Sequence, residues 1–332
     1  TLLPHKSRSP FSKMSAAKPL SPGSSRKRTL SPKKVAKHVD EPAQTETAAP
    51  APKPTSIFST TAPEFLRPYL ATNPMKRDGE WFFIWYSAAW IGFFAIVLLF
   101  RLWDGIADLG YALIGLAAAV PCVVFPIFWP SPEEAKVEWH KRYTFKANVW
   151  VAAFNFIGNY FWTHYFFALL GASYTFPIKY TFNKIPPVCF LLTQPYFQTY
   201  HAFSNLLLRF VRRKMRPTWI RFIVVCITVL AVALFWSLAE TVTIASFPYY
   251  SFTDRTLMYQ IGTGFYALYF IVSFPMFIRI DEEGNTKWTW SKALLDSLAA
   301  AMIVFTLCDF WRLTIGNIVP GKSTDTLPFL QK

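Results

Sequence analysis

Charged residues are scarce in this 332-residue chain: they make up 16% of it, against 53% hydrophobic and 18% aromatic residues. Cysteine is also rare, and Cys122, Cys189, Cys226 and Cys308 show no CxxC spacing. Each lies in or beside an apolar stretch, so we interpret the four as packing residues rather than as disulfides or metal ligands. So little charge with so many rings excludes an ordinary soluble domain.

Several functional motifs are missing as well. No HExxH or comparable histidine spacing is present, which predicts no metal site. The sequence has no detectable inverted repeat and no pair of broken hydrophobic segments, which disfavours a transporter or channel. Lys292, the only lysine of the last apolar stretch, lies at its edge, which disfavours a retinal receptor.

Long apolar stretches dominate the chain after Glu80. A bilayer core about 30 Å thick requires ~20 mostly apolar residues in a spanning helix. We therefore predict an all-α integral membrane protein, a bundle of about seven transmembrane helices at 81–101, 109–129, 147–171, 187–209, 219–245, 258–280 and 292–315. Alternate loops carry thirteen and four Lys or Arg residues, which predicts that the N-terminus lies on the inner side.

The first part of the chain differs from the rest. The net charge is +15, and residues 1–39 contain ten Lys or Arg residues and no acidic residue. We predict a disordered basic leader or tail at 1–75, a polytopic membrane domain at 76–320 and a short C-terminal tail at 321–332. The leader is typical of a plastid or mitochondrial transit peptide, or of a cytosolic tail that touches anionic lipid. Nucleic-acid binding is disfavoured because the rest of the chain is embedded in lipid.

Polar side chains form stripes on two predicted spans. At helical spacing, one face of the span 187–209 carries Gln194, Gln198, His201 and Asn205. One face of the span 147–171 carries Asn148, Asn155, Asn159 and Thr163. Polar groups at such depth are expensive and often functional. They also serve as hydrogen bonds between helices, so the stripes alone leave both interpretations open.

Three ionisable residues are predicted to lie at similar depth. His164, Glu240 and Asp309 fall 17 to 21 residues beyond the inner start of their spans. At about 1.5 Å per residue, this places all three in the outer half of the membrane, as a shared polar pocket would require. Asp309 is also three residues before Arg312, so a structural ion pair is the alternative there. The loop 246–255 could form a lid or a tight interfacial turn.

Several segments occur in the order typical of one family. The chain resembles the cycloeucalenol cycloisomerase (cyclopropyl-sterol isomerase) family in KRYTFKANVW (141–150), GNYFWTHYFFALLGASYTFP (158–177), YHAFSN (200–205), AETVTIASFPYYSF (239–252), DRTLMY (254–259), YFIVSFPMFIRIDEEG (269–284), ALLDSLAAAM (293–302) and DFWRLTIGNIVP (309–320). The resemblance covers residues 76–320 but not the leader. The chain departs from the family at Pro187 and Gln194, where histidine is common.

The resemblance implies that the protein opens the 9β,19-cyclopropane ring of a cyclosterol, converting cycloeucalenol to an obtusifoliol-type Δ8 sterol. This chemistry needs an acid that protonates C19, a site that tolerates a cation at C9, and a base that removes the C8 proton. No redox cofactor is required, because nothing is oxidised overall. The expected partners are a sterol substrate and membrane lipid.

The residues can supply these groups. A carboxyl in a dry apolar pocket stays protonated and can act as an acid, which suits Glu240 or Asp309, while His164 or His201 could act as base or relay. We expect the substrate-binding residues to be Asn159, Trp162, Tyr165, Trp236, Tyr266 and Gln194.

The departures at Pro187 and Gln194 leave a second interpretation open. The protein could be a non-catalytic paralogue that serves as a structural subunit of a larger organelle membrane complex. Sterol chemistry favours the endoplasmic reticulum, whereas the basic leader favours a plastid or mitochondrial membrane.

Overall fold

The computed structural model describes residues 62–245, 247–282 and 288–320. The chain divides into two units, residues 1–52 and 53–332, and every described residue belongs to the second. Most of the predicted leader and all of the predicted C-terminal tail lie outside the described residues.

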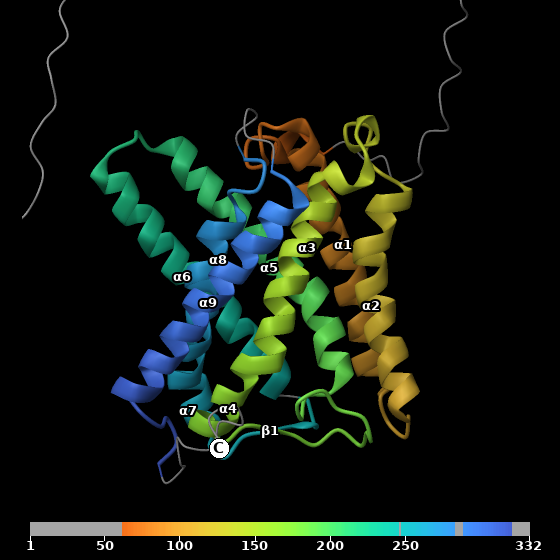
Figure 1. The fold of residues 1–332 in the computed structure, drawn as a ribbon, viewed down its shortest axis with the longest axis vertical. Helices are drawn as coiled ribbons and strands as arrows, with labels where there is room; N and C mark the ends of the chain where they lie inside the picture. The colour runs from red at the N-terminus through yellow and green to blue at the C-terminus, as the bar shows by residue number, and fades with distance from the viewer. Residues whose placement is uncertain (1–61, 246, 283–287, 321–332) are drawn as a thin grey trace, which may run out of the picture. The chain divides into compact units, whose positions relative to one another are not determined.

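Seven long helical segments make up most of the described part of the chain (Figure 1). Five are single α-helices: α1 (Pro74–Leu99), α2 (Asp108–Phe128), α5 (Pro187–Lys214), α6 (Trp219–Ala245) and α9 (Trp290–Thr314). Two are interrupted by a π-helical turn: α3 (Tyr143–Ile157) continues through Gly158–Trp162 into α4 (Thr163–Leu170), and α7 (Arg255–Leu257) continues through Met258–Gly262 into α8 (Thr263–Phe277).

The remaining elements are short. Strands β1 (Ser173–Tyr174) and β2 (Tyr250–Ser251) form one antiparallel pair. Three 3₁₀ turns occupy Glu64–Leu66, Glu134–Lys136 and Trp139–Lys141. The all-helical prediction is therefore confirmed for the described residues.

In the described part of the chain, five helical segments are long and apolar enough to cross a membrane: α1, α2, α6, Arg255–Phe277 and α9. The chain is thus an integral membrane protein. The segments 143–170 and 187–214, which carry the two polar stripes, are outside this set, so the count of seven spans stays a prediction.

Helix α1 begins seven residues before the predicted span. Asn73 caps it, because its side chain accepts a hydrogen bond from the Met75 amide at 3.1 Å, and Pro74 occupies the first helical position. The charged first turns lower the local hydropathy, which is why the apolar pattern begins only at residue 81.

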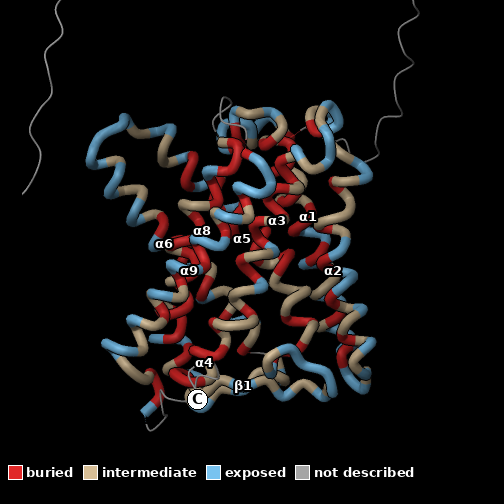
Figure 2. The backbone as a smooth tube through the Cα atoms, viewed as in Figure 1, coloured by how far each residue is buried: buried red, intermediate tan, exposed pale blue. Residues whose placement is uncertain are grey.

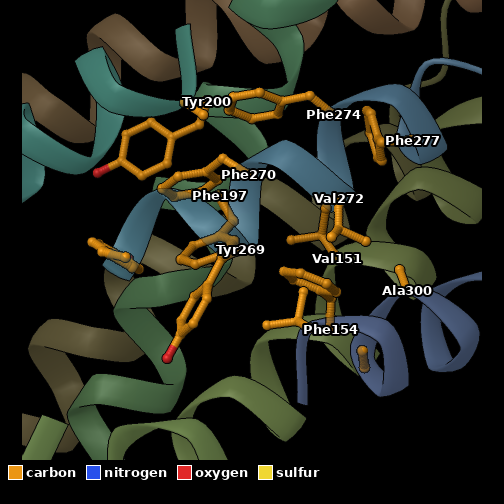
Figure 3. Packing of buried hydrophobic residues seen from close by; sticks show 14 of the residues in the cluster. Val151, Phe154, Phe197, Tyr200, Tyr269, Phe270, Val272, Phe274, Phe277 and Ala300 are labelled. Carbon is orange, nitrogen blue, oxygen red and sulfur yellow. The ribbon is translucent and has the colours of Figure 1, made fainter. Parts of the chain in front are cut away.

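The helices pack in contacting pairs, with α6 against α8, α2 against α5 and α3 against α9. Buried residues concentrate on the faces that the helices turn toward one another (Figure 2). In Figure 3, aromatic rings from α5 and α8 lie against one another. Phe270 lies 5.3 Å from Phe197 and 5.1 Å from Phe274 between ring centroids. Ring packing of this kind therefore fixes α5 and α8 side by side.

A buried ionic network joins α1 and α5 to the loop after α8. Arg209 donates two hydrogen bonds to Glu80, at 2.7 and 3.0 Å, and two to Glu282, at 2.7 and 2.8 Å. Lys76 lies 2.8 Å from Glu282 and donates to the Ile278 carbonyl at 2.6 Å. Burial would raise the pKa of Glu282, but Arg209 and Lys76 lower it to about 2. Sequence reasoning placed none of these residues together.

The loop between α2 and α3 contains a buried acid, Glu134, whose pKa is raised rather than lowered. Glu134 accepts hydrogen bonds from the Thr144 amide at 2.8 Å and from the Thr144 hydroxyl at 2.9 Å. Burial nevertheless raises the pKa of Glu134 from 4.5 to about 7, because the bonds from Thr144 and the charge of Arg142 offset only part of the desolvation.

This raised pKa predicts a pH-dependent stability. The folded state binds the proton more tightly than the unfolded state, so the contribution is fully present below pH 4.5 and is lost as the pH rises through 7. Between pH 5 and pH 8 the wild type should lose about 2 kcal/mol of unfolding free energy relative to Glu134→Gln. Thermal unfolding of the two purified proteins at both pH values measures this difference. Parallel pH profiles would show that Glu134 is not responsible.

Candidate functional site

A cavity of about 390 Å³ lies among α1, α2, the α3–α4 segment, α5, α6, α8 and the two strands. This volume falls in the ~300–1,000 Å³ range of small-molecule sites. The walls are dominated by aromatic rings, which gives the cavity an apolar surface suited to a hydrocarbon ligand.

Two pairs of closely packed rings, one stacked and one tilted, define parts of the wall. Tyr200 and Trp236 lie 4.6 Å apart between ring centroids, and Trp90 lies 4.5 Å from Tyr196. The faces of tryptophan and tyrosine rings attract positive charge. The cavity can therefore favour a ligand that becomes cationic during a reaction.

One carboxyl group faces this aromatic space. Glu240, on α6, is the only acidic residue among the described residues that line the cavity, and no Lys, Arg or His lines it with Glu240. The Tyr266 hydroxyl donates a hydrogen bond to Glu240 Oε2 at 2.6 Å, and the Tyr200 hydroxyl approaches the same carboxyl. A carboxylate without a cationic partner is costly in an apolar site, so the environment favours the neutral acid.

A second polar group lies where α3 meets its π-helical turn. Asn159 donates from Nδ2 to the Asn155 carbonyl at 3.0 Å and to Thr193 Oγ1 at 2.9 Å. Asn155 donates from Nδ2 to the Thr193 carbonyl at 2.9 Å. All three residues line the cavity. π-Helical turns recur at functional sites, and this one places Asn159 on the cavity wall.

The strand pair and the residues on either side of β2 contribute to the wall of the cavity. Tyr174, Phe247, Tyr250 and Phe252 all line it. Tyr250 Oη lies 3.6 Å from Cys189 Sγ, which ties β2 to α5. The described part of the loop 246–255 thus forms part of the cavity wall.

Four of the ten predicted site residues line the cavity: Asn159, Trp236, Glu240 and Tyr266. The other six are not among its lining residues: His164, His201, Asp309, Trp162, Tyr165 and Gln194. Equal depth along the helices was the basis for grouping His164, Glu240 and Asp309, but depth does not determine which way a side chain points.

The two histidines are buried away from the cavity. His201 donates from Nδ1 to the Phe197 carbonyl at 2.6 Å and lies 4.8 Å from the Phe277 ring. His164 is also buried, 5.3 Å from the Phe167 ring, and its Nε2 has no hydrogen-bond partner among the described residues. Neither imidazole is placed to accept a proton from a ligand in the cavity.

The other four residues have structural partners. Asp309 accepts hydrogen bonds from Arg312 at 2.8 Å and from Tyr165 at 3.2 Å. The contact with Arg312 is the structural ion pair that the sequence offered as the alternative for Asp309. Trp162 packs 4.7 Å from the Tyr269 ring. Gln194 donates to Asn148 Oδ1 at 2.9 Å and so links α5 to α3.

Sequence reasoning missed Tyr200 and Thr193. Tyr200 stands beside His201 in the YHAFSN segment, where the histidine drew attention because it can titrate. Thr193 precedes Gln194, and the stripe assigned to this helix passed through Gln194 instead. Among the described residues, no group of three or more His, Cys, Asp or Glu could hold a metal ion.

Comparison with known proteins gives one strong similarity. The chain is 44% identical over 255 residues to the protein named "Cycloeucalenol cycloisomerase" from Arabidopsis thaliana, which covers 76% of this chain and 91% of that protein. No protein-family model matches the chain. No solved structure matches it either.

Proposed function

The chain belongs to the cycloeucalenol cycloisomerase family, and from this we propose that it opens the 9β,19-cyclopropane ring of a cyclosterol to give a Δ8 sterol. The observation that carries the proposal is Glu240, a carboxyl without a cationic partner in an aromatic cavity. The chain is an isomerase by its family, and an acid in an aromatic cavity is the group that the proposed ring opening requires.

The first step is protonation of the ring. Neutral Glu240 donates its proton to C19, the C9–C19 bond supplies the electron pair for the new C–H bond, and C9 is left with a positive charge. The hydrogen bond from Tyr266 holds the carboxyl in place and stabilises the carboxylate as it forms. The low polarity of the wall makes the neutral acid the ground state.

The cation at C9 is short-lived and needs stabilisation. The ring faces of Tyr200 and Trp236, which line the cavity beside Glu240, provide it without a nucleophile that could trap the cation. Loss of the C8 proton then forms the C8–C9 double bond. The Glu240 carboxylate is the strongest base among the described residues of the wall, so returning the proton there regenerates the acid with no net consumption.

The membrane setting fits a sterol. We place all seven long helical segments across the bilayer of the endoplasmic reticulum, with the substrate passing sideways from lipid into the cavity. The departures from the family do not remove a group from the wall: Pro187 begins α5, and Gln194 bonds to Asn148 outside the cavity. The cavity is thus equipped for catalysis, which favours the enzyme over the structural subunit.

Expression in yeast tests the proposal. Microsomes that contain the chain should convert added cycloeucalenol to a Δ8 sterol of the same mass, detected by gas chromatography and mass spectrometry. Microsomes with an empty vector provide the blank. If the folded protein is present and the cyclopropane is recovered intact, the isomerase proposal is wrong.

A further inference from the structure

The side-chain amides of Asn155 and Asn159, two residues that line the cavity, have their N–H groups engaged by protein acceptors. Asn159 Nδ2 bonds to the Asn155 carbonyl and to Thr193 Oγ1. Asn155 Nδ2 bonds to the Thr193 carbonyl and, at 3.4 Å, to Gln194 Oε1. A carbonyl can only accept a hydrogen bond, so these contacts fix which end of each amide is nitrogen.

Neither amide oxygen accepts a hydrogen bond from the described residues, but the two differ in accessibility. Asn155 Oδ1 is fully enclosed by protein, whereas Asn159 Oδ1 is not among the enclosed unpartnered atoms of the described residues. Both residues line the cavity, although Asn159 is only 7% exposed and Asn155 only 3%. Buried polar groups in folded proteins nearly always find a partner, so Asn159 Oδ1 is the acceptor of this pair that a ligand in the cavity can use.

From this pair we infer that the protein selects its substrate by the hydroxyl group at C3, which donates a hydrogen bond to Asn159 Oδ1. The inference rests on the proposed function, because it takes the ligand to be a sterol. Thr193 is a positioning residue: its hydroxyl accepts from Asn159 and donates to the Cys189 carbonyl at 3.0 Å, so it holds the amide in one orientation.

The depths of the two polar groups suit this assignment. Asn159 lies eleven residues before the end of α4, and Glu240 lies five residues before the end of α6. Both helices lead toward the strands that pair with each other. The difference of six residues corresponds to about 9 Å along the helices. In the sterol, the A ring separates the C3 hydroxyl from the cyclopropane. The length of this ring, added to the reach of the Asn159 and Glu240 side chains, covers the difference in depth.

The acceptor on Asn159 discriminates among sterols by the group at C3. An alcohol can donate a hydrogen bond to Asn159 Oδ1, whereas a 3-ketone would place its own lone pairs against that oxygen. A 3-deoxy sterol would leave the oxygen desolvated and unpaired. Leaving a buried polar group without a partner costs about 1–3 kcal/mol, which corresponds to roughly ten- to hundredfold weaker binding.

The test uses cycloeucalenol, its 3-ketone and its 3-deoxy analogue with the purified full-length chain in detergent. Binding is followed by quenching of tryptophan fluorescence, since Trp90, Trp103 and Trp236 line the cavity. The wild type should bind the alcohol at least tenfold more tightly than either analogue. In Asn159→Leu the alcohol and the deoxy analogue should bind within about threefold of each other, because the acceptor is gone.

Two further variants make the result independent of folding defects. Thr193→Val keeps the Asn159 acceptor but removes its anchor, and should lose part of the alcohol preference. Thr306→Val, an exposed position on α9, should keep the wild-type preference. An unchanged preference in folded Asn159→Leu would overturn the inference.

Turnover of the same three sterols separates this inference from the proposed function. Selective binding of the alcohol without ring opening would support the hydroxyl site and overturn the isomerase proposal. Ring opening at equal rates for alcohol and ketone would support the isomerase proposal and overturn the hydroxyl site. If none of the three sterols bound, both would fall.

Discussion

Replacement of Glu240 by glutamine is expected to reduce ring opening by about 10³-fold, within the range that general acid catalysis contributes. Glutamine has nearly the same shape and can still accept the hydrogen bond from Tyr266, so the cavity should keep its form. It has no acidic proton to deliver to C19. Binding of the cyclosterol should therefore stay within a few-fold of the wild type while turnover falls.

A matched control distinguishes the acid from its support. Tyr266→Phe removes one hydrogen bond to the carboxyl but leaves the acid in place, so we expect a loss of about tenfold. The rates are measured with purified protein and cycloeucalenol under single-turnover conditions. Equal rates for Glu240→Gln and the wild type would eliminate Glu240 as the acid.

The second large effect concerns stability. Arg209→Leu should lower the free energy of unfolding by about 3–5 kcal/mol, because it leaves two carboxylates buried without their main partner. Arg209 is 2% exposed and donates to both Glu80 and Glu282. Arg213→Leu, on the exposed side of the same helix, is the matched control and should change little. Unfolding in detergent, followed by circular dichroism, gives both values.

A double variant checks the cause. Adding Glu80→Gln to Arg209→Leu removes one of the stranded charges and should recover part of the lost stability. Glu80→Gln alone gives the reference for this comparison. If the two substitutions lower the free energy of unfolding additively in the double variant, the loss in Arg209→Leu comes from packing rather than from unpaired charge.

The helices were predictable because their signal is long and simple. Apolar runs of about twenty residues mark five of the seven long helical segments of the described chain, and the predicted ends of these five differ from the observed ends by a few residues. Asn73 and Pro74 form a helix-capping signal. The predicted start of this helix followed the hydropathy pattern instead and was therefore placed at residue 81. The network of Lys76, Glu80 and Arg209 was not predictable, since its members lie in distant segments and each is an ordinary charged residue near a helix end.

The candidate site was predictable only in part. Glu240 stood out because it is a carboxyl within an apolar span and the sequence offers no basic partner for it on the same helix. Its partners Tyr200 and Tyr266 come from other helices, so helix neighbours had to be known first. The predicted stripe holds along the α3–α4 segment as far as Thr163, which lines the cavity with Asn155 and Asn159. The site residues predicted off that stripe, Trp162, His164 and Tyr165, are not among the lining residues.

The most direct test follows the proton itself. The purified chain is equilibrated in D₂O and incubated with cycloeucalenol, and the Δ8 product is examined by deuterium NMR. We predict one deuterium in the C19 methyl group with the wild type, and no product above background with Glu240→Gln. A Δ8 product formed at the wild-type rate by Glu240→Gln, or intact cyclosterol after incubation with folded wild-type protein, would contradict ring opening by the carboxyl of α6.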